Sequence, residues 1–177
     1  MTQADFIVPP VSWAYLHQTT SQLRKAFGLE NERRFPVLEF IENVLCAQME
    51  MVDFQVWSKE EMKSAEGYTC PKGTFLALRE DVYLSACAGE GRARFTAAHE
   101  LGHFVLHSNR PLARVPDRSV VKPYMLAEPQ AHRFAAELLM PREHMQPTDT
   151  VPVVMARHGV SSEAAAIRIK CMLKGWK

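Results

Sequence analysis

The sequence lacks several features that would place it in a class at once. No apolar run approaches the ~20 residues that a membrane-spanning helix needs, so no membrane contact is expected. The first residues, MTQADFIVPPVSWAYLHQ, contain no basic segment followed by an apolar run, and we therefore expect no secretion signal. The cysteines form no CxxC pair and lie far apart, at Cys46, Cys70, Cys87 and Cys171. This spacing predicts reduced thiols in a cytoplasmic protein.

An excess of charge of one sign is also missing. Lysine and arginine number 21 against 20 aspartate and glutamate residues, which leaves a formal net charge of +1. A protein that binds the phosphate backbone needs a basic surface, so direct nucleic-acid binding is not expected. The chain contains no internal repeat either. With 177 residues and a hydrophobic content of 47%, it is long enough for one compact domain with a core of its own.

What the sequence does contain predicts an α+β fold in three consecutive segments. Residues 1–35 are expected to form an irregular arm to about residue 18 and then a helix that begins after Thr20 and ends near Gly28. Residues 36–144 are expected to form the core. Residues 145–177 contain two prolines and then two apolar segments around Gly159, which predict a pair of helices packed on the core.

The core segment combines short strands with longer helices. Two apolar runs around the turn Pro71-Lys72-Gly73 predict a β-hairpin in a small antiparallel or mixed sheet. The other elements follow from apolar periodicity and from the positions of proline and glycine. In chain order we expect a helix from Pro36, a strand over 52–57, the hairpin strands Tyr68–Cys70 and Thr74–Leu78, a long helix that ends at His107, a proline-rich loop over 108–124 and a helix over 126–140.

The segment FTAAHELGHFVLH, from Phe95 to His107, is largely apolar apart from three histidines and a glutamate. At 100° per residue, His103 lies about 40°, His107 about 80° and Glu100 about 100° from His99 around the helix. All four share one flank of a helix that is apolar almost all round and therefore belongs inside the protein. Such side chains would cost several kcal/mol there without partners. A divalent metal ion resolves the problem, because it binds neutral imidazoles and favours an ionised carboxylate nearby.

The spacing gives these four side chains different roles. His99 and His103 lie one turn apart, ~6 Å along the axis, and can reach one ion, whereas His107 lies ~12 Å from His99 and cannot. His107 is therefore expected to orient a ligand or to serve in packing. Glu100 faces the open coordination position, where it can take a proton from water and pass it to a leaving amine. This is the logic of the HExxH motif of metallopeptidases.

A catalytic zinc ion needs a third protein ligand, which a second helix over EPQAHRFAAELLMP is expected to supply. Glu128 and His132 lie four residues apart on one face of this helix, whereas Glu137 lies on the opposite side. Glu128 is the favoured ligand and His132 is the alternative; the one that does not bind would orient a ligand. A purely structural zinc ion would require a fourth ligand, for which Cys87 or His144 is available.

The segments RARFTAAHELGHFVLH and EPQAHRFAAELLMP together resemble the ImmA/IrrE family of zinc metallopeptidases. The resemblance runs from about Pro36 to Pro141, and the later segment HGVSSEAAAIRIK resembles the C-terminal helices of that family. It implies a zincin-like core of the gluzincin type. Its pattern makes His99, His103 and Glu128 the ligands of Zn²⁺, with Mn²⁺ as the alternative ion, and makes Glu100 the catalytic carboxylate. His132 departs from the pattern, because many members have Asn or Asp there.

The resemblance also implies a function. Members cleave or release DNA-binding repressors, so this chain is expected to be a cytoplasmic zinc-dependent endopeptidase that acts on a helix-turn-helix repressor or an antitoxin. Such cleavage would switch on genes of stress responses, mobile elements or toxin–antitoxin loci. The rival hypothesis is a regulator or toxin component that uses the same scaffold to bind a partner repressor or nucleic acid without proteolysis.

Two further parts of a peptidase site have candidates in the sequence. In zincins, an extended substrate pairs with an edge strand of the sheet, and the candidates here are Thr74, Phe75, Leu76, Ala77 and Leu78. A hydrogen-bond donor should also stabilise the oxyanion of the reaction. The sequence leaves four candidates for this donor, which are Tyr68, Tyr83, Tyr124 and His107.

Overall fold

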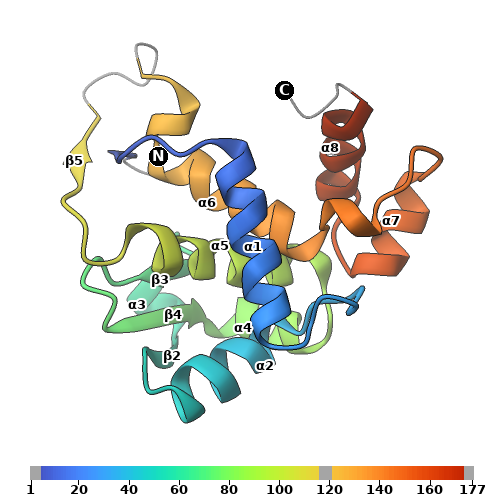
Figure 1. Cartoon of the computed structure of the whole chain (residues 1–177). Helices are drawn as coiled ribbons and strands as arrows, with labels where there is room; N and C mark the ends of the chain where they lie inside the picture. The colour runs from blue at the N-terminus through green and yellow to red at the C-terminus, as the bar shows by residue number, and fades with distance from the viewer. Residues whose placement is uncertain (1–4, 116–120, 174–177) are drawn as a thin grey trace.

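The computed structural model describes residues 5–115 and 121–173 and shows an α+β fold (Figure 1). The strands are β1 (Phe6–Ile7), β2 (Asp53–Trp57), β3 (Gly67–Thr69), β4 (Phe75–Arg79) and β5 (Ala113–Arg114). The α-helices are α1 (Trp13–Ala26), α2 (Val37–Glu39), α3 (Lys59–Met62), α4 (Glu80–Cys87), α5 (Gly91–His107), α6 (Ala127–Leu139), α7 (Val151–His158) and α8 (Ser162–Leu173). The π-helix η1 (Phe40–Gln48) and the 3-10 helices η3 (Pro123–Met125) and η4 (Arg142–His144) complete the elements. Within these described ranges, no helix has both the length and the apolar character to cross a membrane.

Strands β2, β4 and β3 form a mixed sheet in that order. The predicted hairpin is confirmed, because β3 and β4 are antiparallel with Gly67 opposite Leu78. On its other side, β4 pairs in parallel with β2, so that Asp53 lies opposite Phe75. The prediction that Thr74–Leu78 forms an edge strand for substrate is therefore wrong, because β4 lies in the centre of the sheet and its backbone is already paired on both sides.

Helix α5 lies between the sheet and α6 and forms the middle of the core (Figure 1). Leu76 and Leu78 of β4, Leu101 of α5 and Phe134 of α6 are fully buried in one apolar cluster. Removal of this apolar surface from water is the main source of stability for such a core. The long helix that carries HELGH is thus held by packing on two sides.

The N-terminal segment is more regular than its sequence pattern predicts. Helix α1 begins at Trp13 rather than after Thr20, because the side-chain oxygen of Ser12 accepts a hydrogen bond from the backbone N–H of Tyr15 and caps the first turn. Before α1, β1 pairs with β5 and forms a bridge to the residue that precedes α6. The prediction of an irregular arm up to residue 18 is therefore wrong for residues 13–18.

Two helices in the first half of the chain differ from expectation. The helix expected from Pro36 forms, but after the single turn α2 it continues as the π-helix η1. Its hydrogen bonds span five residues, as in the bond from the Met49 N–H to the Val44 carbonyl oxygen. Helix α4 was not predicted and follows β4 directly. Glu80 and Asp81 lie in its first turn, where carboxylates interact favourably with the helix dipole. This short helix lacks the long apolar pattern that reveals a helix in a sequence.

The last two helices fold as predicted. Helix α7 ends at Gly159, which has a φ of 62°, and α8 begins at Ser162. The buried Arg168 of α8 donates to a Glu137 oxygen at 2.7 Å and to the Met140 carbonyl oxygen at 2.9 Å. These bonds attach α8 to the C-terminal end of α6, and Figure 1 shows the two elements meeting there.

Candidate metal centre

Helix α5 presents its ionisable side chains at close range to α6. Glu90 caps the start of α5 by accepting hydrogen bonds from the backbone N–H groups of Arg92 and Ala93. Further along, a Cβ atom on Gly102 would lie 3.1 Å from the Ala131 carbonyl oxygen of α6. The glycine in HELGH therefore lets the two helices approach closely. This approach brings the first turn of α6 beside the histidines of α5.

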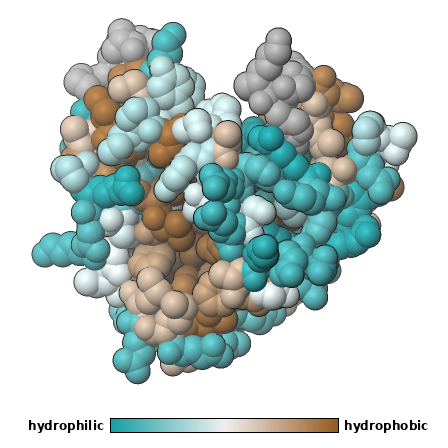
Figure 2. Space-filling view, viewed as in Figure 1, coloured by the Kyte–Doolittle hydropathy of each residue, from teal (hydrophilic) through white to brown (hydrophobic). Residues whose placement is uncertain are grey.

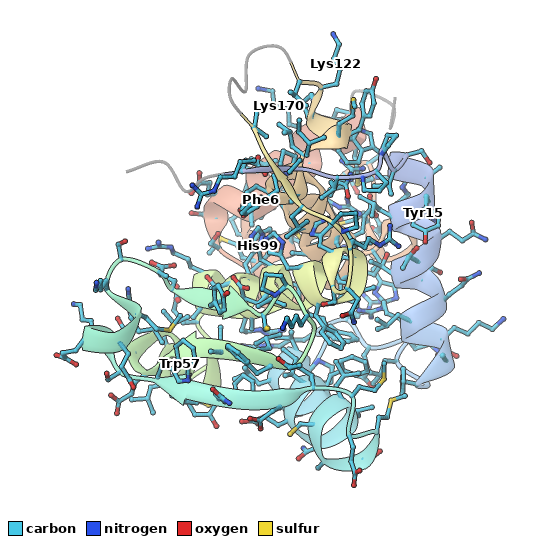
Figure 3. All side chains as sticks on the ribbon, turned by 90° about the vertical axis from the view of Figure 1, so that its left-hand side faces the viewer. Phe6, Tyr15, Trp57, His99, Lys122 and Lys170 are labelled. Atoms are coloured by element: carbon cyan, nitrogen blue, oxygen red, sulfur yellow. The ribbon has the colours of Figure 1, made fainter. Side chains whose placement is uncertain are left out.

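His99, His103 and Glu128 form one partly buried group. The Nε2 atoms of the two histidines are 3.0 Å apart. The Glu128 oxygens lie 3.2 Å from His99 Nε2 and 3.3 Å from His103 Nε2. In the part of the chain that the structure describes, these are the His, Cys, Asp or Glu residues that offer three potential ligand atoms within 4.8 Å of one another. Figure 3 shows His99 between the sheet and the N-terminal segment that carries Phe6.

The charges in this group favour a cation. Burial lowers the pKa of His103, but its hydrogen bond to Glu128 and the charges of Glu100 and Glu128 outweigh burial and leave the pKa above its ordinary value. Burial raises the pKa of Glu128, but its hydrogen bonds to His103 and His99 outweigh burial and leave the pKa below its ordinary value. The carboxylate therefore stays ionised and attracts positive charge to the imidazole nitrogens. A divalent ion would supply that charge without a proton.

Glu100 lies beside this group and contacts β3. Its side chain is buried, and the Thr69 hydroxyl lies 2.7 Å from its Oε2 atom. A Cβ atom on Gly67 would lie 2.5 Å from the Glu100 Cγ atom, so the absence of a side chain at Gly67 leaves the space that Glu100 occupies. Burial raises the pKa of Glu100 above its ordinary value, although His103, His99 and Thr69 act in the opposite direction. The carboxylate is thus fixed in position and has a raised affinity for a proton.

His107 takes no part in the three-residue group, as its spacing predicted. Its Nδ1 atom lies 3.0 Å from the Nδ1 atom of His103, and its Nε2 atom lies 3.0 Å from the side-chain oxygen of Gln130. Burial lowers the pKa of His107 to about 4, so the ring is neutral at pH 7. His107 therefore contacts His103 on the side of the ring that faces away from Glu128.

The alternative ligands lie outside the group. The ring of His132 lies 5.3 Å from that of His99 and 5.0 Å from that of Phe95, centroid to centroid. Cys87 and His144, the candidates for a fourth ligand, are not part of the group either. Within residues 5–115 and 121–173, the group therefore contains three potential protein ligands, which are His99, His103 and Glu128.

Contacts elsewhere exclude most of the candidates for an oxyanion donor. The Tyr83 hydroxyl donates to a Glu42 oxygen at 2.8 Å. Tyr68 packs on Trp57 and Phe75, and it lies on the face of β3 opposite to the neighbouring residues that contact Glu100. His107 uses both ring nitrogens in the contacts described above. Tyr124 stays a prediction from the sequence.

A groove with a volume of about 940 Å³ begins at Glu128 and extends between α6 and α8. Apolar side chains that include Trp13, Phe95 and Ile167 line it, together with charged residues such as Glu163. In Figure 2, a notch at the upper edge of the molecule separates the side that carries α8 from the side that carries the N-terminal segment. Glu128 of the three-residue group thus borders an open space.

Sequence reasoning missed four residues of this site, which are Asp5, Gly67, Thr69 and Gln130. The Asp5 carboxylate accepts a hydrogen bond from the backbone N–H of Glu128 at 3.1 Å and so caps the first turn of α6. Gly67 and Thr69 belong to β3, and Gln130 contacts His107. All four act between segments that are distant in the sequence, so no local period reveals them. The only signal for Gln130 was its place in the EPQAH segment.

Comparison with known proteins bears on the same helices. A family model of peptidases, described as the IrrE N-terminal-like domain, matches residues 49–170. The match covers more than half of the chain and includes both α5 and α6. The chain matches no curated protein. Residues 1–48, with the capping residue Asp5, lie outside the matched range.

Proposed function

Since the chain belongs to the peptidase family of the IrrE N-terminal-like domain, we propose that it is a zinc-dependent endopeptidase with a zincin-like core of the gluzincin type. One observation carries the proposal: His99, His103 and Glu128 converge beside the buried carboxylate of Glu100. These are the residues that the HELGH and EPQAH segments indicate by their resemblance to ImmA/IrrE peptidases. Two histidines, a glutamate and a neighbouring carboxylate are what metal-assisted peptide hydrolysis requires.

The donor set fits zinc. Ligands about 2.1 Å from a tetrahedral ion lie about 3.4 Å from one another. The contacts within this group measure 3.0, 3.2 and 3.3 Å. Nitrogen and oxygen donors without a thiolate suit a catalytic zinc ion, and Mn²⁺ is the alternative. Three protein ligands also leave room for water, as catalytic sites require.

The residues of the chain then have distinct roles. Zinc held by this group would act as a Lewis acid toward the scissile carbonyl and lower the pKa of the attacking water. Glu100 is the proposed general base, which takes the proton of that water and delivers it to the leaving amine. Its raised pKa and its contacts with Thr69 and Gly67 support this role, because they increase its proton affinity and hold it beside the ligands.

The strand that we propose to bind substrate is β3, in place of β4. Within the described residues, β3 forms one edge of the three-stranded sheet. The backbone bonds of Glu66 and Cys70 run to β4, so by alternation Gly67 and Thr69 turn their backbone groups to the open edge. An extended peptide can pair with these groups by strand addition and so lie next to Glu100.

The substrate that we propose is a DNA-binding repressor or an antitoxin, in line with the resemblance to ImmA/IrrE peptidases. An edge strand accepts an extended segment, so a folded protein without such a segment would be a poor substrate. The groove next to Glu128 offers space for apolar side chains of the bound protein. Cleavage would then depend on the presentation of one suitable segment rather than on general proteolysis.

The test compares the wild type with Glu100→Gln. Each protein, loaded with zinc or manganese, is incubated with the product of the regulator gene that neighbours its own, and cleavage is followed by mass spectrometry. We expect Glu100→Gln to keep its metal and to lose activity by about 100-fold to 10,000-fold, the usual contribution of a general base. Glu60→Gln, an exposed change on α3, serves as the matched control and should keep full activity.

The rival hypothesis of a non-proteolytic scaffold makes the opposite prediction. If Glu100→Gln retained the biological effect of the wild type, binding rather than hydrolysis would be the function. Unchanged cleavage by Glu100→Gln would remove this residue from the mechanism. Loss of metal from Glu100→Gln would also contradict the proposal, because Glu100 is not a ligand in it.

A further inference from the structure

A chain of hydrogen bonds connects the N-terminal segment to the metal group. The side-chain nitrogen of Gln130 lies 3.0 Å from the Pro9 carbonyl oxygen and 2.8 Å from the Tyr124 carbonyl oxygen. Carbonyl oxygens can only accept, so the group that faces them must be the NH₂ of Gln130. The side-chain oxygen of Gln130 then faces the Nε2 atom of His107 at 3.0 Å. The two carbonyls therefore fix the orientation of this amide.

The orientation of Gln130 decides which nitrogen of His107 carries a proton. Because the amide oxygen accepts, His107 Nε2 donates, and the Nδ1 atom of the neutral ring carries a lone pair. That lone pair faces the Nδ1 atom of His103 at 3.0 Å and accepts its proton in a hydrogen bond. A neutral His103 with its proton on Nδ1 has its lone pair on Nε2. This is the atom that faces His99 and Glu128.

We propose that Gln130 and His107 are positioning residues of the metal centre, which hold His103 in the tautomer and ring orientation that bind the ion. The inference rests on the metal site of the proposed function but does not depend on peptide hydrolysis. Gln130 is 1% exposed and His107 is 4% exposed, so water does not compete for these hydrogen bonds. A buried chain of this kind is rigid because each member has one arrangement that satisfies its neighbours.

The arrangement singles out one of the two histidines. Within the described residues, the Nδ1 atom of His99 is buried and has no hydrogen-bond partner. His103 is therefore the ligand whose orientation the protein sets from outside the group. The chain begins at the Pro9 carbonyl, in the segment that lies outside the family match. This gives the N-terminal segment a part in the metal centre.

The first test reads the tautomers directly in the wild type. The full chain, labelled with ¹⁵N and loaded with zinc, is studied by long-range ¹H–¹⁵N correlation of the histidine rings. We expect the proton of His107 on Nε2 and that of His103 on Nδ1. A proton on Nδ1 of His107 would overturn the proposal, because that nitrogen could then no longer accept from His103.

The second test measures zinc affinity by competition with a chromophoric chelator. Gln130→Met and His107→Phe remove the hydrogen bonds and should weaken zinc binding roughly 10-fold to 100-fold, the usual effect of losing a group that orients a ligand. His107→Gln offers an acceptor and a donor in a similar arrangement and should retain most of the affinity. The matched control is Gln22→Met, on the exposed face of α1, which should bind zinc like the wild type.

The outcomes distinguish a failure of the positioning role from a failure of the proposed function. Equal zinc affinity of Gln130→Met, His107→Phe and the wild type overturns the positioning role. Equal losses in His107→Gln and His107→Phe also overturn it, since packing alone would then explain them. A wild type that binds no zinc overturns this inference together with the proposed function, whereas zinc binding without hydrolysis affects the proposed function alone. If circular dichroism shows that a variant does not fold, the tautomers of His103 and His107 in the wild type still test the proposal.

Discussion

Two glutamates on α6 lie in contrasting surroundings. The side chain of Glu137 is fully buried and contacts Arg168 at 2.7 Å and Arg133 at 2.8 Å. The side chain of Glu128 is 24% exposed and contacts the imidazoles of His99 and His103. Guanidinium groups are always charged, whereas an imidazole carries a charge only when it is protonated. The fold therefore gives Glu137 permanently charged partners, whereas the contacts of Glu128 are with groups whose charge depends on protonation.

This difference separates a structural role from a functional one. Burial raises the pKa of Glu137, but Arg168, Arg133 and Arg142 outweigh burial and leave the pKa below its ordinary value. The pair of Glu137 and Arg168 joins α6 to α8 and is complete without any ligand. The proposed metal ion would give Glu128 a partner of permanent positive charge. One helix thus carries an ion pair that joins two elements of the fold and a carboxylate that we propose as a metal ligand.

The largest effect on folding is expected from Glu137→Gln. This change replaces the carboxylate that contacts the buried Arg168 by a neutral amide. Removal of the charge of one partner in a buried pair costs about 3–5 kcal/mol. Urea unfolding of the zinc-free protein measures this. Glu66→Gln is the matched control, because its partner Arg92 is 72% exposed and such a pair contributes at most about 1 kcal/mol. Equal losses in the two variants would contradict the structural role of Glu137.

Glu128→Gln should have the reverse profile. We expect zinc affinity to fall by more than about 100-fold, because loss of a ligand should exceed the effect of losing a group that only orients one. The free energy of unfolding of the zinc-free protein should change by less than in Glu137→Gln, because Glu128 is partly exposed and contacts imidazoles rather than buried guanidinium groups. Chelator competition and urea unfolding measure the two quantities. A variant that kept its zinc would remove Glu128 from the ligand set.

A smaller effect on the stability of the zinc-free protein is expected when the pH is lowered. The pKa of Glu137 is lower in the folded chain than its ordinary value of 4.5, so the unfolded chain binds more protons between the two values. Its contribution is present above the ordinary value and is lost as the pH falls through the folded value. The zinc-free wild type should therefore lose stability as the pH is lowered from about 5 toward 3, and Glu137→Gln should lose less. Parallel curves for the two proteins would refute this cause.

The sequence predicted the parts of the site that depend on local spacing. Rotation around one helix was enough to pair His99 with His103 and to separate His107 from them. The register of a second helix placed Glu128 and His132 on one face, the resemblance to ImmA/IrrE peptidases favoured Glu128, and the hairpin followed from a proline and glycine turn. In each case the determining residues lie within a few turns of one another, where backbone geometry fixes their relative positions.

The parts that the sequence did not predict depend on contacts between distant segments. The order of the strands is set by the parallel pairing of β2 with β4, so the edge strand beside Glu100 is β3 and not β4. Asp5 and Gln130 act through contacts with residues far along the chain. The start of α1 depends on the cap at Ser12, and the residues that follow Ser12 do not show a clear apolar period that would mark a helix. Such features follow from packing rather than from periodicity.

The central claim is that a metal ion binds to two histidines and one glutamate. X-ray absorption at the zinc edge, together with elemental analysis of the purified full chain, tests it directly. We expect one zinc per chain with nitrogen and oxygen ligands at about 2.0–2.2 Å, and loss of this signal in Glu128→Gln. A sulfur ligand at about 2.3 Å, or an unchanged spectrum in Glu128→Gln, would contradict the claim.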